Sequence, residues 1–387
     1  MKDTRITDSI VYIGVDDKTI DLFESQYVVP NGVSYNSYVI FDEKTTIMDT
    51  ADSRATDAWF ENLTAALGDR KPEYLVISHL EPDHAANIKA AADRYPEMKL
   101  VGNAKTFQML PQFFEGDYSS RYVTVKEGDE LSLGSHTLKF FMAPMVHWPE
   151  VMVSYEMSEK VLFSADGFGK FGALDAEEPW DDEARRYFIN IVGKYGMQVQ
   201  ALLKKAATLD IQMICPLHGP ILKENLGHYI EKYDIWSSYR PETEGVLVAF
   251  ASIHGHTAEA ARKMADILKA KGAQVVLMDL ARTGVSDAVS AAFQYSHMAL
   301  LAASYDGGVF PCMEDFLLHL KAKNYQNRKV ALVQNGSWAP SAGKCMTAIL
   351  EGMKNVSICE PMVTIRSAMK PENVTEMETL ADALLNA

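Results

Sequence analysis

His79-Leu-Glu-Pro-Asp-His84 follows the run Tyr74-Leu-Val-Ile-Ser78, whose apolar residues indicate a buried β-strand. The hexapeptide places two imidazoles and two carboxylates at the point where this strand is expected to end. Imidazole binds several transition metals, whereas two nearby carboxylates favour harder ions such as iron or manganese. The stretch therefore predicts a metal site, with a polar surface turn as the alternative.

Further apolar runs along the chain each lead to a His or an Asp. The run 138–142 precedes His147, the run 161–163 precedes Asp166, and the run 211–215 precedes His218. In α/β folds, ligands bind just beyond the carboxyl ends of strands. A lone His is more often structural than a ligand. The succession of strand ends, each carrying a suitable donor, favours one shared metal site instead.

The order of these donors resembles that of the metallo-β-lactamase fold, down to the turn Pro216-Leu-His-Gly-Pro220. Hydrolases of that superfamily carry His where this chain has Glu81, and the carboxylate is similar to that of the flavodiiron proteins, which reduce dioxygen and nitric oxide. The stretches 34–38 and 48–51 also fit the early strands of that family. The resemblance covers essentially all 387 residues. It implies an α/β protein with an N-terminal metallo-β-lactamase-like αββα sandwich and then a flavodoxin-like doubly wound parallel sheet.

Length and composition agree with two globular domains. A chain of 387 residues exceeds what one hydrophobic core usually organises. Its net charge of -15 argues against nucleic acid as a partner, since phosphate recognition needs clustered Lys and Arg. The sequence has neither an apolar run long enough for a membrane span nor an apolar segment typical of a secretory signal near its start. We therefore expect neither nucleic acid nor a membrane as a partner.

The cysteines indicate a reducing compartment. Cys215, Cys312, Cys345 and Cys359 lie far apart and form no Cys-x-x-Cys pair. They are too sparse for a disulfide scaffold and unsuitable for an iron–sulfur or rubredoxin site. A cytoplasmic location is the expectation.

The domain boundary is expected near Pro241-Glu-Thr-Glu-Gly245, where a Pro, two acids and a Gly interrupt a segment, 223–240, that could be helical. We place a diiron domain at 1–243 and an FMN-binding domain at 244–387. The second begins with the buried strand Val246–Ala251. After the loop that follows, Ala261, Met264, Ala265 and Leu268 share one face of an expected helix.

The loop before that helix is a candidate anion site, because backbone N–H groups at a helix N-terminus and nearby hydroxyls hold phosphate. Two later apolar runs, 297–303 and 329–333, also end in polar loops. Together the loops resemble the FMN site of flavodoxins, the first for the phosphate and the others for the ring. Tyr305 and Trp338 are stacking candidates, with ordinary core packing as the alternative. The candidate FMN residues are Ser252, Ile253, His254, Gly255, His256, Thr257, Ser304, Tyr305, Asp306, Gly307, Gly308, Asn335, Gly336, Ser337 and Trp338.

The family resemblance also implies a role for each metal-site residue. His79, Glu81 and His147 are expected to hold one iron, Asp83 and His218 the second, and Asp166 to bridge them. His84 is either a weak ligand or an unligated imidazole that donates a proton or hydrogen bond during catalysis. Trp148 and Tyr195 could wall the pocket, or simply pack in the core. The implied cofactors are FMN and two iron ions.

The implied activity is an oxidoreductase that reduces dioxygen to water, nitric oxide to nitrous oxide, or both. Electrons are expected from rubredoxin or another external donor, since the sequence has no cysteine-rich module of its own. The resemblance further implies a head-to-tail homodimer or a dimer of such dimers. One alternative is a zinc-dependent hydrolase of the same fold, fused to a flavodoxin electron-transfer module. Another is a non-enzymatic electron carrier with a degenerate first domain.

Overall fold

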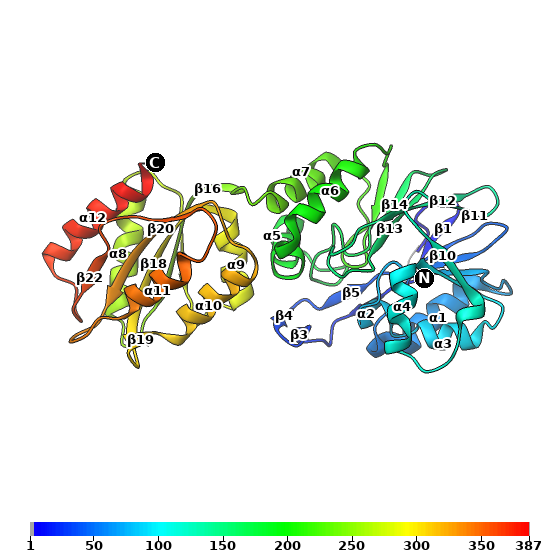
Figure 1. The fold of residues 1–387 in the computed structure, drawn as a ribbon, viewed down its shortest axis with the longest axis horizontal. Coiled ribbons are helices and arrows are strands. Elements are labelled where there is room, and N and C mark those ends of the chain that lie inside the picture. The colour runs from blue at the N-terminus through cyan, green and yellow to red at the C-terminus, as the bar shows by residue number, and fades with distance from the viewer. Residues whose placement is uncertain (1–3, 387) are drawn as a thin grey trace. The chain divides into compact units, whose positions relative to one another are not determined.

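A computed structural model of the chain describes residues 4–386 (Figure 1). These residues form two compact units. The N-terminal unit comprises residues up to Phe188 together with Met197–Asp234, and the C-terminal unit comprises Ile189–Gly196 and the chain from Ile235 onward. No helix within residues 4–386 is long and apolar enough to cross a lipid bilayer.

The N-terminal unit contains two β-sheets that face each other. The six-stranded sheet has the order β1 (Ile10–Tyr12), β6 (Tyr38–Ile40), β7 (Thr46–Met48), β8 (Tyr74–Val76), β9 (Lys99–Asn103) and β10 (Tyr122–Val125). The five-stranded sheet has the order β11 (Glu130–Ser132), β12 (Thr137–Met142), β13 (Met152–Glu156), β14 (Val161–Phe163) and β15 (Met213–Cys215). One core cluster joins them, with Tyr38 and Val76 from the first sheet and Phe140 and Phe163 from the second.

Helices flank this pair of sheets. Figure 1 shows the helices of residues 56–109 beside the first sheet and those of residues 180–237 beside the second, which gives the expected αββα sandwich. Short strand pairs, β2 with β5 and β3 with β4, complete the unit. The helices are α1 (Thr56–Leu67), α2 (Pro82–Ala85), α3 (Ile88–Arg94), α4 (Ala104–Met109), α5 (Trp180–Tyr187), α6 (Gly196–Ala206) and α7 (Leu226–Ser237), and the short strands are β2 (Val15–Asp17), β3 (Leu22–Phe23), β4 (Tyr27–Val28) and β5 (Val33–Tyr35).

The C-terminal unit is a parallel sheet with helices on both faces. Its strand order is β17 (Val275–Asp279), β16 (Thr243–Ala251), β18 (Tyr295–Tyr305), β20 (Arg328–Asn335) and β21 (Val356–Ile358), and β22 (Val363–Ile365) also pairs with β20. Counted from β16, this is the 2-1-3-4-5 order of flavodoxin-like folds, so the expected fold class is confirmed. The remaining elements are α8 (His256–Ala270), α9 (Val285–Gln294), β19 (Gly308–Val309), α10 (Pro311–Ala322), α11 (Ala342–Leu350) and α12 (Pro371–Leu385).

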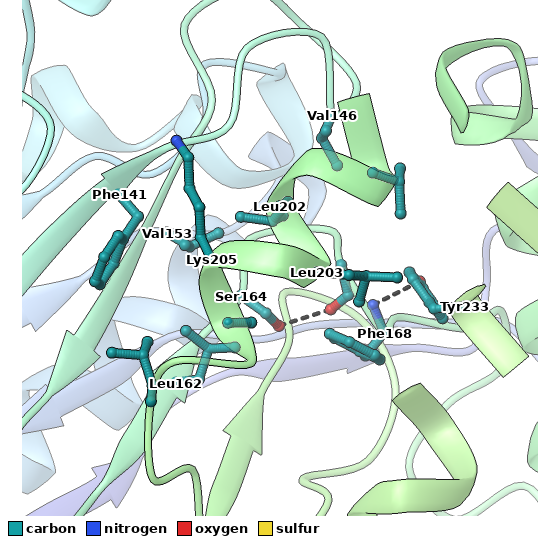
Figure 2. A pocket seen from close by; sticks show the side chains of 14 residues that line it. Phe141, Val146, Val153, Leu162, Ser164, Phe168, Leu202, Leu203, Lys205 and Tyr233 are labelled. Carbon is teal, nitrogen blue, oxygen red and sulfur yellow. Dashed lines mark hydrogen bonds between the residues drawn. The ribbon is translucent and has the colours of Figure 1, made fainter. Parts of the chain in front are cut away.

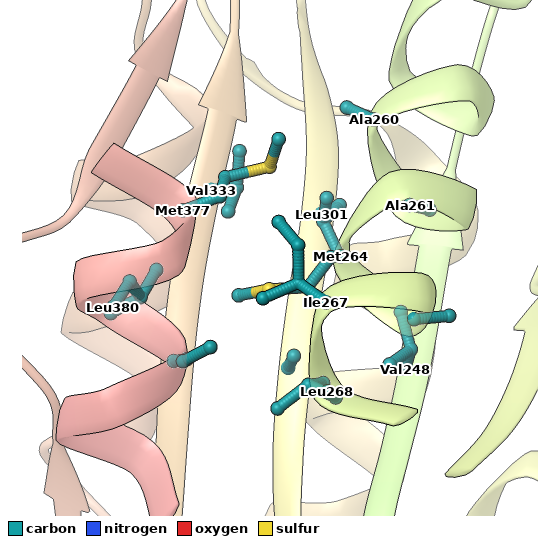
Figure 3. Packing of buried hydrophobic residues seen from close by; sticks show 14 of the residues in the cluster. Val248, Ala260, Ala261, Met264, Ile267, Leu268, Leu301, Val333, Met377 and Leu380 are labelled. Atoms are coloured by element: carbon teal, nitrogen blue, oxygen red, sulfur yellow. The ribbon is translucent and has the colours of Figure 1, made fainter. Parts of the chain in front are cut away.

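The predicted apolar face of α8 packs into the core of this sheet. Met264 and Leu268 on α8 contact a cluster that includes Val248 and Val333 of the sheet and Met377 of α12 (Figure 3). Ala261, Met264, Ala265 and Leu268 are all buried, as their spacing predicts.

Two element boundaries differ from the sequence expectation. β8 ends at Val76 rather than Ser78, because the N–H of Ser78 donates to the carboxylate of Asp49 at 2.7 Å instead of to a neighbouring strand. β16 begins at Thr243, inside the stretch expected to be a linker.

Candidate functional site

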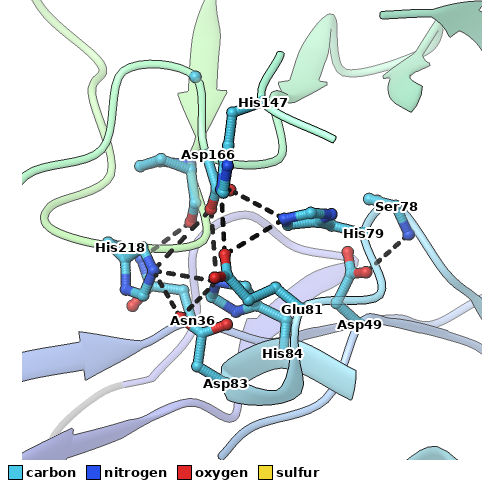
Figure 4. A network of polar contacts seen from close by, with 12 residues as sticks. Asn36, Asp49, Ser78, His79, Glu81, Asp83, His84, His147, Asp166 and His218 are labelled. Atoms are coloured by element: carbon cyan, nitrogen blue, oxygen red, sulfur yellow. Dashed lines mark hydrogen bonds and ion pairs between the residues drawn. The ribbon is translucent and has the colours of Figure 1, made fainter. Parts of the chain in front are cut away.

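The ends of four strands bring together seven side chains that could hold metal ions in the N-terminal unit (Figure 4). The loop after β8 and the short helix α2, which begins at Pro82, carry four of them. The others come from the β12–β13 loop, the loop after β14 and the turn after β15. Two groups of ligand atoms result, each spanning no more than 4.8 Å: His79, Glu81, His147 and Asp166 in the first, and Asp83, His84 and His218 in the second.

In the first group, imidazole nitrogens alternate with carboxylate oxygens. Glu81 Oε2 lies 3.0 Å from His147 Nε2 and 3.4 Å from His79 Nε2. Asp166 Oδ2 lies 3.2 Å from His147 Nε2 and 3.3 Å from His79 Nε2. Two imidazoles and two carboxylates therefore point at one small volume.

The second group is smaller and contains His84. His84 Nε2 lies 3.0 Å from His218 Nε2, and Asp83 Oδ2 lies 3.3 Å from the first nitrogen and 3.1 Å from the second. Asp166 reaches this group too, because its Oδ1 lies 3.3 Å from His84 Nε2 and 3.8 Å from His218 Nε2. The two oxygens of one carboxylate thus face the two groups.

Several of these buried atoms lack a hydrogen-bond partner among the described residues. They are His79 Nε2, His84 Nδ1 and both carboxylate oxygens of Asp83 and of Asp166. Buried polar atoms are normally satisfied, and an unpaired buried carboxylate oxygen is costly. The Nε2 atoms of His84 and His218 also face each other, and at most one proton fits between them. The donor set therefore fits metal cations, and its all nitrogen-and-oxygen character suits iron or manganese better than a thiolate-preferring metal.

Hydrogen bonds to neighbouring groups fix the orientation of two of these imidazoles. The Nδ1 atom of His79 bonds to Glu150 Oε1 at 2.8 Å, and this oxygen also accepts the N–H of Leu80 at 2.8 Å. The Nδ1 of His218 donates to the carbonyl of Ser34 at 2.8 Å. Each bond turns Nε2 toward the site and fixes the tautomer, as partners of metal-binding His usually do. Sequence reasoning assigned Glu150 no role, although its place three residues after His147 on the same loop was a usable signal.

The charges of the cluster compensate one another. Burial by itself lowers the pKa of His79, but Asp166, Glu150 and Glu81 outweigh it and hold this pKa well above its usual value. Burial also lowers the pKa of His147, but Asp166 and Glu81 outweigh this effect and raise that pKa to about 9. The pKa of Asp166 is held well below its usual range, since the surrounding imidazoles overcome its burial. Protons on imidazole thus balance the carboxylates, and a metal ion would replace those protons.

Aromatic rings wall the cluster. The Trp148 ring meets His79 edge-on with centroids 5.2 Å apart, and Phe23 and Tyr187 lie 5.3 and 5.5 Å from the His218 ring. The ring of Tyr195, the other residue expected to wall the pocket, lies under the ammonium of Lys194.

A second candidate site is a cavity of ≈ 580 Å³ in the C-terminal unit, at the carboxyl ends of β16, β18 and β20. Its volume lies in the range of small-molecule sites. Of the predicted FMN residues, Gly255 and Gly308 do not line it, whereas Ala303, Ala339, Ser341 and Ser367 do so without having been predicted. The predicted residues that line it are Ser252, Ile253, His254, His256, Thr257, Ser304, Tyr305, Asp306, Gly307, Asn335, Gly336, Ser337 and Trp338.

The loops of this cavity suit a phosphate and a flat ring. Gly255 precedes α8 with φ of 100°, a conformation that favours glycine, and its N–H donates to Ser252 Oγ at 3.2 Å. His256 and Thr257, at the N-terminus of α8, line the cavity, and backbone N–H groups at a helix N-terminus favour an anion. Tyr305 and Trp338 are 45% and 89% exposed, so core packing does not explain them.

Ser367 reaches the cavity from the loop after β22. Its backbone N–H donates to Asn335 Oδ1 at 3.0 Å, and its carbonyl accepts from Asn335 Nδ2 at 2.9 Å. The strand before it, Val363–Ile365, contains Thr364 and so is not a continuous apolar run like those that marked the other strand ends.

Comparisons with known proteins agree with this architecture. A family model described as ODP family beta lactamase matches residues 33–219, which include all seven side chains of the two candidate metal-ligand groups. The rubredoxin-oxygen oxidoreductase of Megalodesulfovibrio gigas is 27% identical over 100% of this chain and 98% of its own length. The nitric oxide reductase of Moorella thermoacetica is 27% identical over 95% of this chain and 94% of its own length.

Solved structures of the same type superpose along the chain. The rubredoxin oxygen:oxidoreductase from Desulfovibrio gigas matches with a TM-score of 0.92 and 26% identity, covering 98% of this chain and 97% of that one. The flavodiiron protein from Giardia intestinalis also gives a TM-score of 0.92, covering 99% of this chain and 96% of that one, at 23% identity.

Proposed function

Because the chain belongs to the flavodiiron proteins, we propose that it is an oxidoreductase that reduces dioxygen to water, nitric oxide to nitrous oxide, or both. The reaction takes place at a non-haem diiron site, with electrons delivered through FMN from rubredoxin or a similar donor. Dioxygen consumes four electrons and four protons to give two waters. Two molecules of nitric oxide consume two electrons and two protons to give nitrous oxide and water.

The observation that carries this proposal is the position of Asp166 between the two groups of ligands. His79, Glu81 and His147 would hold one iron and Asp83 and His218 the second, and each oxygen of Asp166 faces one of the groups. When bound, the two irons supply redox electrons to a small substrate, chemistry that zinc lacks.

The protein's own groups have three tasks around this centre. Glu150 and the carbonyl of Ser34 orient the imidazoles of His79 and His218. His84, whose Nε2 lies 3.0 Å from His218 Nε2, would hold a proton or a hydrogen bond beside the second iron or bind that iron weakly. The rings of Trp148 and Tyr187 exclude bulk water from the imidazoles.

FMN binds in the cavity at the carboxyl ends of β16, β18 and β20. Residues Ser252–Thr257 and the N-terminus of α8 would hold its phosphate, and the loops that carry Tyr305 and Trp338 would hold its ring. The metal ligands and the FMN loops belong to different units of one chain. We therefore propose the head-to-tail homodimer of the family, in which the flavin of one subunit serves the irons of the other.

The test is anaerobic turnover of the reduced protein with each gas in turn, followed with dioxygen and nitric oxide electrodes. Iron and FMN are quantified in the same sample, and rubredoxin is compared with other donors as the reductant of FMN. Consumption of either gas supports the proposal. A sample fully loaded with iron and FMN that consumes neither gas contradicts it. Glu81 and the flavin-sized cavity do not favour the zinc hydrolase alternative, which would show zinc instead of iron.

A further inference from the structure

An apolar cavity lies in the N-terminal unit between α6 and the strands β12 to β14 (Figure 2). Its volume is ≈ 20 Å³, compared with the ~10–15 Å³ that one water-sized molecule requires. It therefore has room for a diatomic gas and for little more. Apolar side chains supply most of its wall, among them Phe141, Val153, Leu162, Val199, Leu202 and Leu203.

The polar groups at the edge of this cavity already have partners. Ser164 Oγ donates to the carbonyl of Gly167 at 2.6 Å, and the hydroxyl of Tyr233 accepts the N–H of Phe168. The ammonium of Lys205 bonds to Glu127 Oε2 and to a backbone carbonyl, both at 2.9 Å. A water inside would find few hydrogen bonds, and apolar cavities of this kind stay dry and take up apolar gases.

The cavity shares a wall with the metal centre. The loop after β14 presents Asp166 to the metal ligands and Ser164, Gly167 and Phe168 to the cavity. Gly167 contributes no side chain to this wall, and a Cβ there would lie 2.9 Å from the carbonyl of Ser164, too close for any other residue. Val146, which lines the cavity, directly precedes His147.

We infer that this cavity holds the diatomic gas substrate, dioxygen or nitric oxide, beside the metal centre before reduction. The inference rests on the proposed function and adds to it a binding site for the uncharged substrate. The gas arrives from solution, where it is poorly solvated, and the cavity raises its concentration next to the loop that carries Asp166. A packing defect with no such role is the competing explanation.

The first test locates a gas in the cavity without any turnover. Crystals of the holoprotein are pressurised with krypton, a monatomic apolar gas that anomalous scattering detects. We expect a krypton peak among Val153, Leu162 and Val199. Val199→Phe should abolish the peak, and Val199→Ala should raise its occupancy. No peak in the wild-type cavity overturns the inference.

The second test measures consumption of each gas. Val199→Phe fills the cavity from α6 and alters no proposed ligand, so iron and FMN content should stay at the wild-type level. We expect kcat/KM for dioxygen or nitric oxide to fall roughly threefold or more, with FMN reduction by the donor unchanged. Met197→Phe is the matched control on the same helix, because Met197 is 81% exposed, and it should leave kcat/KM unchanged. If Val199→Phe does not fold, Val199→Leu replaces it.

These outcomes separate the inference from the proposed function. If the loaded wild-type protein consumes neither gas, the proposed function fails and the inference fails with it. If the wild type is active but the Val199 variant retains wild-type kcat/KM, only the inference is overturned.

Discussion

The metal cluster and the flavin cavity are built in different ways. The cluster depends on the identity of buried side chains, several of which have atoms without a hydrogen-bond partner among the described residues. The cavity is lined mostly by small or polar residues, together with two exposed aromatic residues, Tyr305 and Trp338. A ligand side chain has no substitute, whereas an anion held by backbone N–H groups tolerates many side chains. We therefore expect single substitutions to abolish function in the cluster and to weaken binding in the cavity by degrees.

The sharpest test of this contrast is Asp166→Asn. It removes the charge that faces both groups of ligands while preserving the shape of the side chain. We expect loss of at least one iron per chain and loss of gas reduction by about 100-fold or more, with FMN retained. Metal analysis, flavin absorbance and gas electrodes measure these quantities. The matched control is Asp69→Asn, which changes an exposed carboxylate. Full activity of the Asp166 variant would remove the basis of the proposed site.

Glu150→Gln tests whether a residue that hydrogen-bonds to a candidate ligand affects iron binding as strongly as the candidate ligands do. The amide oxygen can still accept from His79 Nδ1 and from the N–H of Leu80, but the neutral side chain lacks the negative charge that the carboxylate places behind His79. Iron affinity should fall by about 10–100-fold, the usual effect of weakening the partner of a metal-binding His. Competition with a chelator measures this change. An unchanged affinity would mean that Glu150 only fills space.

The iron-free protein should lose stability as the pH rises from 6.5 to 9. The pKa of His147 is raised to about 9 and that of His79 lies well above its usual value. The protonated forms of these two imidazoles thus stabilise the fold. This stabilisation is fully present below the unfolded-state pKa of about 6.5 and is lost as the pH rises toward the folded-state pKa values. A loss on the order of 1 kcal/mol would lower Tm by about 2–4 °C.

Iron-loaded protein is the control for this pH series. Bound metal requires neutral imidazoles, so loading should flatten the decline in Tm. On the acid side, the depressed pKa of Asp166 gives stability that is present above its unfolded pKa of about 3.9 and is lost below it. A Tm of the iron-free protein that rises between pH 6.5 and 9 would contradict the assigned charges.

The smallest effect is expected for Trp338→Ala in the flavin cavity. Stacking of one exposed ring contributes about 0.5–1.5 kcal/mol, so FMN affinity should fall by roughly two- to tenfold. The Tm of the FMN-free protein should not change, because 89% of this side chain is exposed. Fluorescence titration with FMN gives the affinity. A complete loss of binding would show that the cavity, like the cluster, depends on single side chains.

Sequence patterns predicted the fold, and they pointed to the side chains that the structure brings together, because buried parallel strands are continuous apolar runs. Such runs mark where each strand ends, and His79, Asp166 and His218 follow directly. The grouping of Ile189–Gly196 with the C-terminal unit was not predictable, since it depends on tertiary packing. Ser367 was not predicted because Thr364 interrupts the apolar strand before it, and Glu150 was not predicted because a carboxylate behind a candidate ligand has no periodicity of its own.

The bond from the N–H of Ser78 to Asp49 has a consequence for protein engineering. It releases the chain from the six-stranded sheet two residues after β8 ends, before the ligand hexapeptide begins. The hexapeptide is therefore held by side chains and not by the strand ladder: Asp49 and Glu150 accept the N–H groups of Ser78 and Leu80, and the hydroxyl of Thr50 donates to the carbonyl of His84. Grafting the equivalent segment of a zinc hydrolase onto Ser78 should leave the sheet intact while changing which metal the scaffold selects.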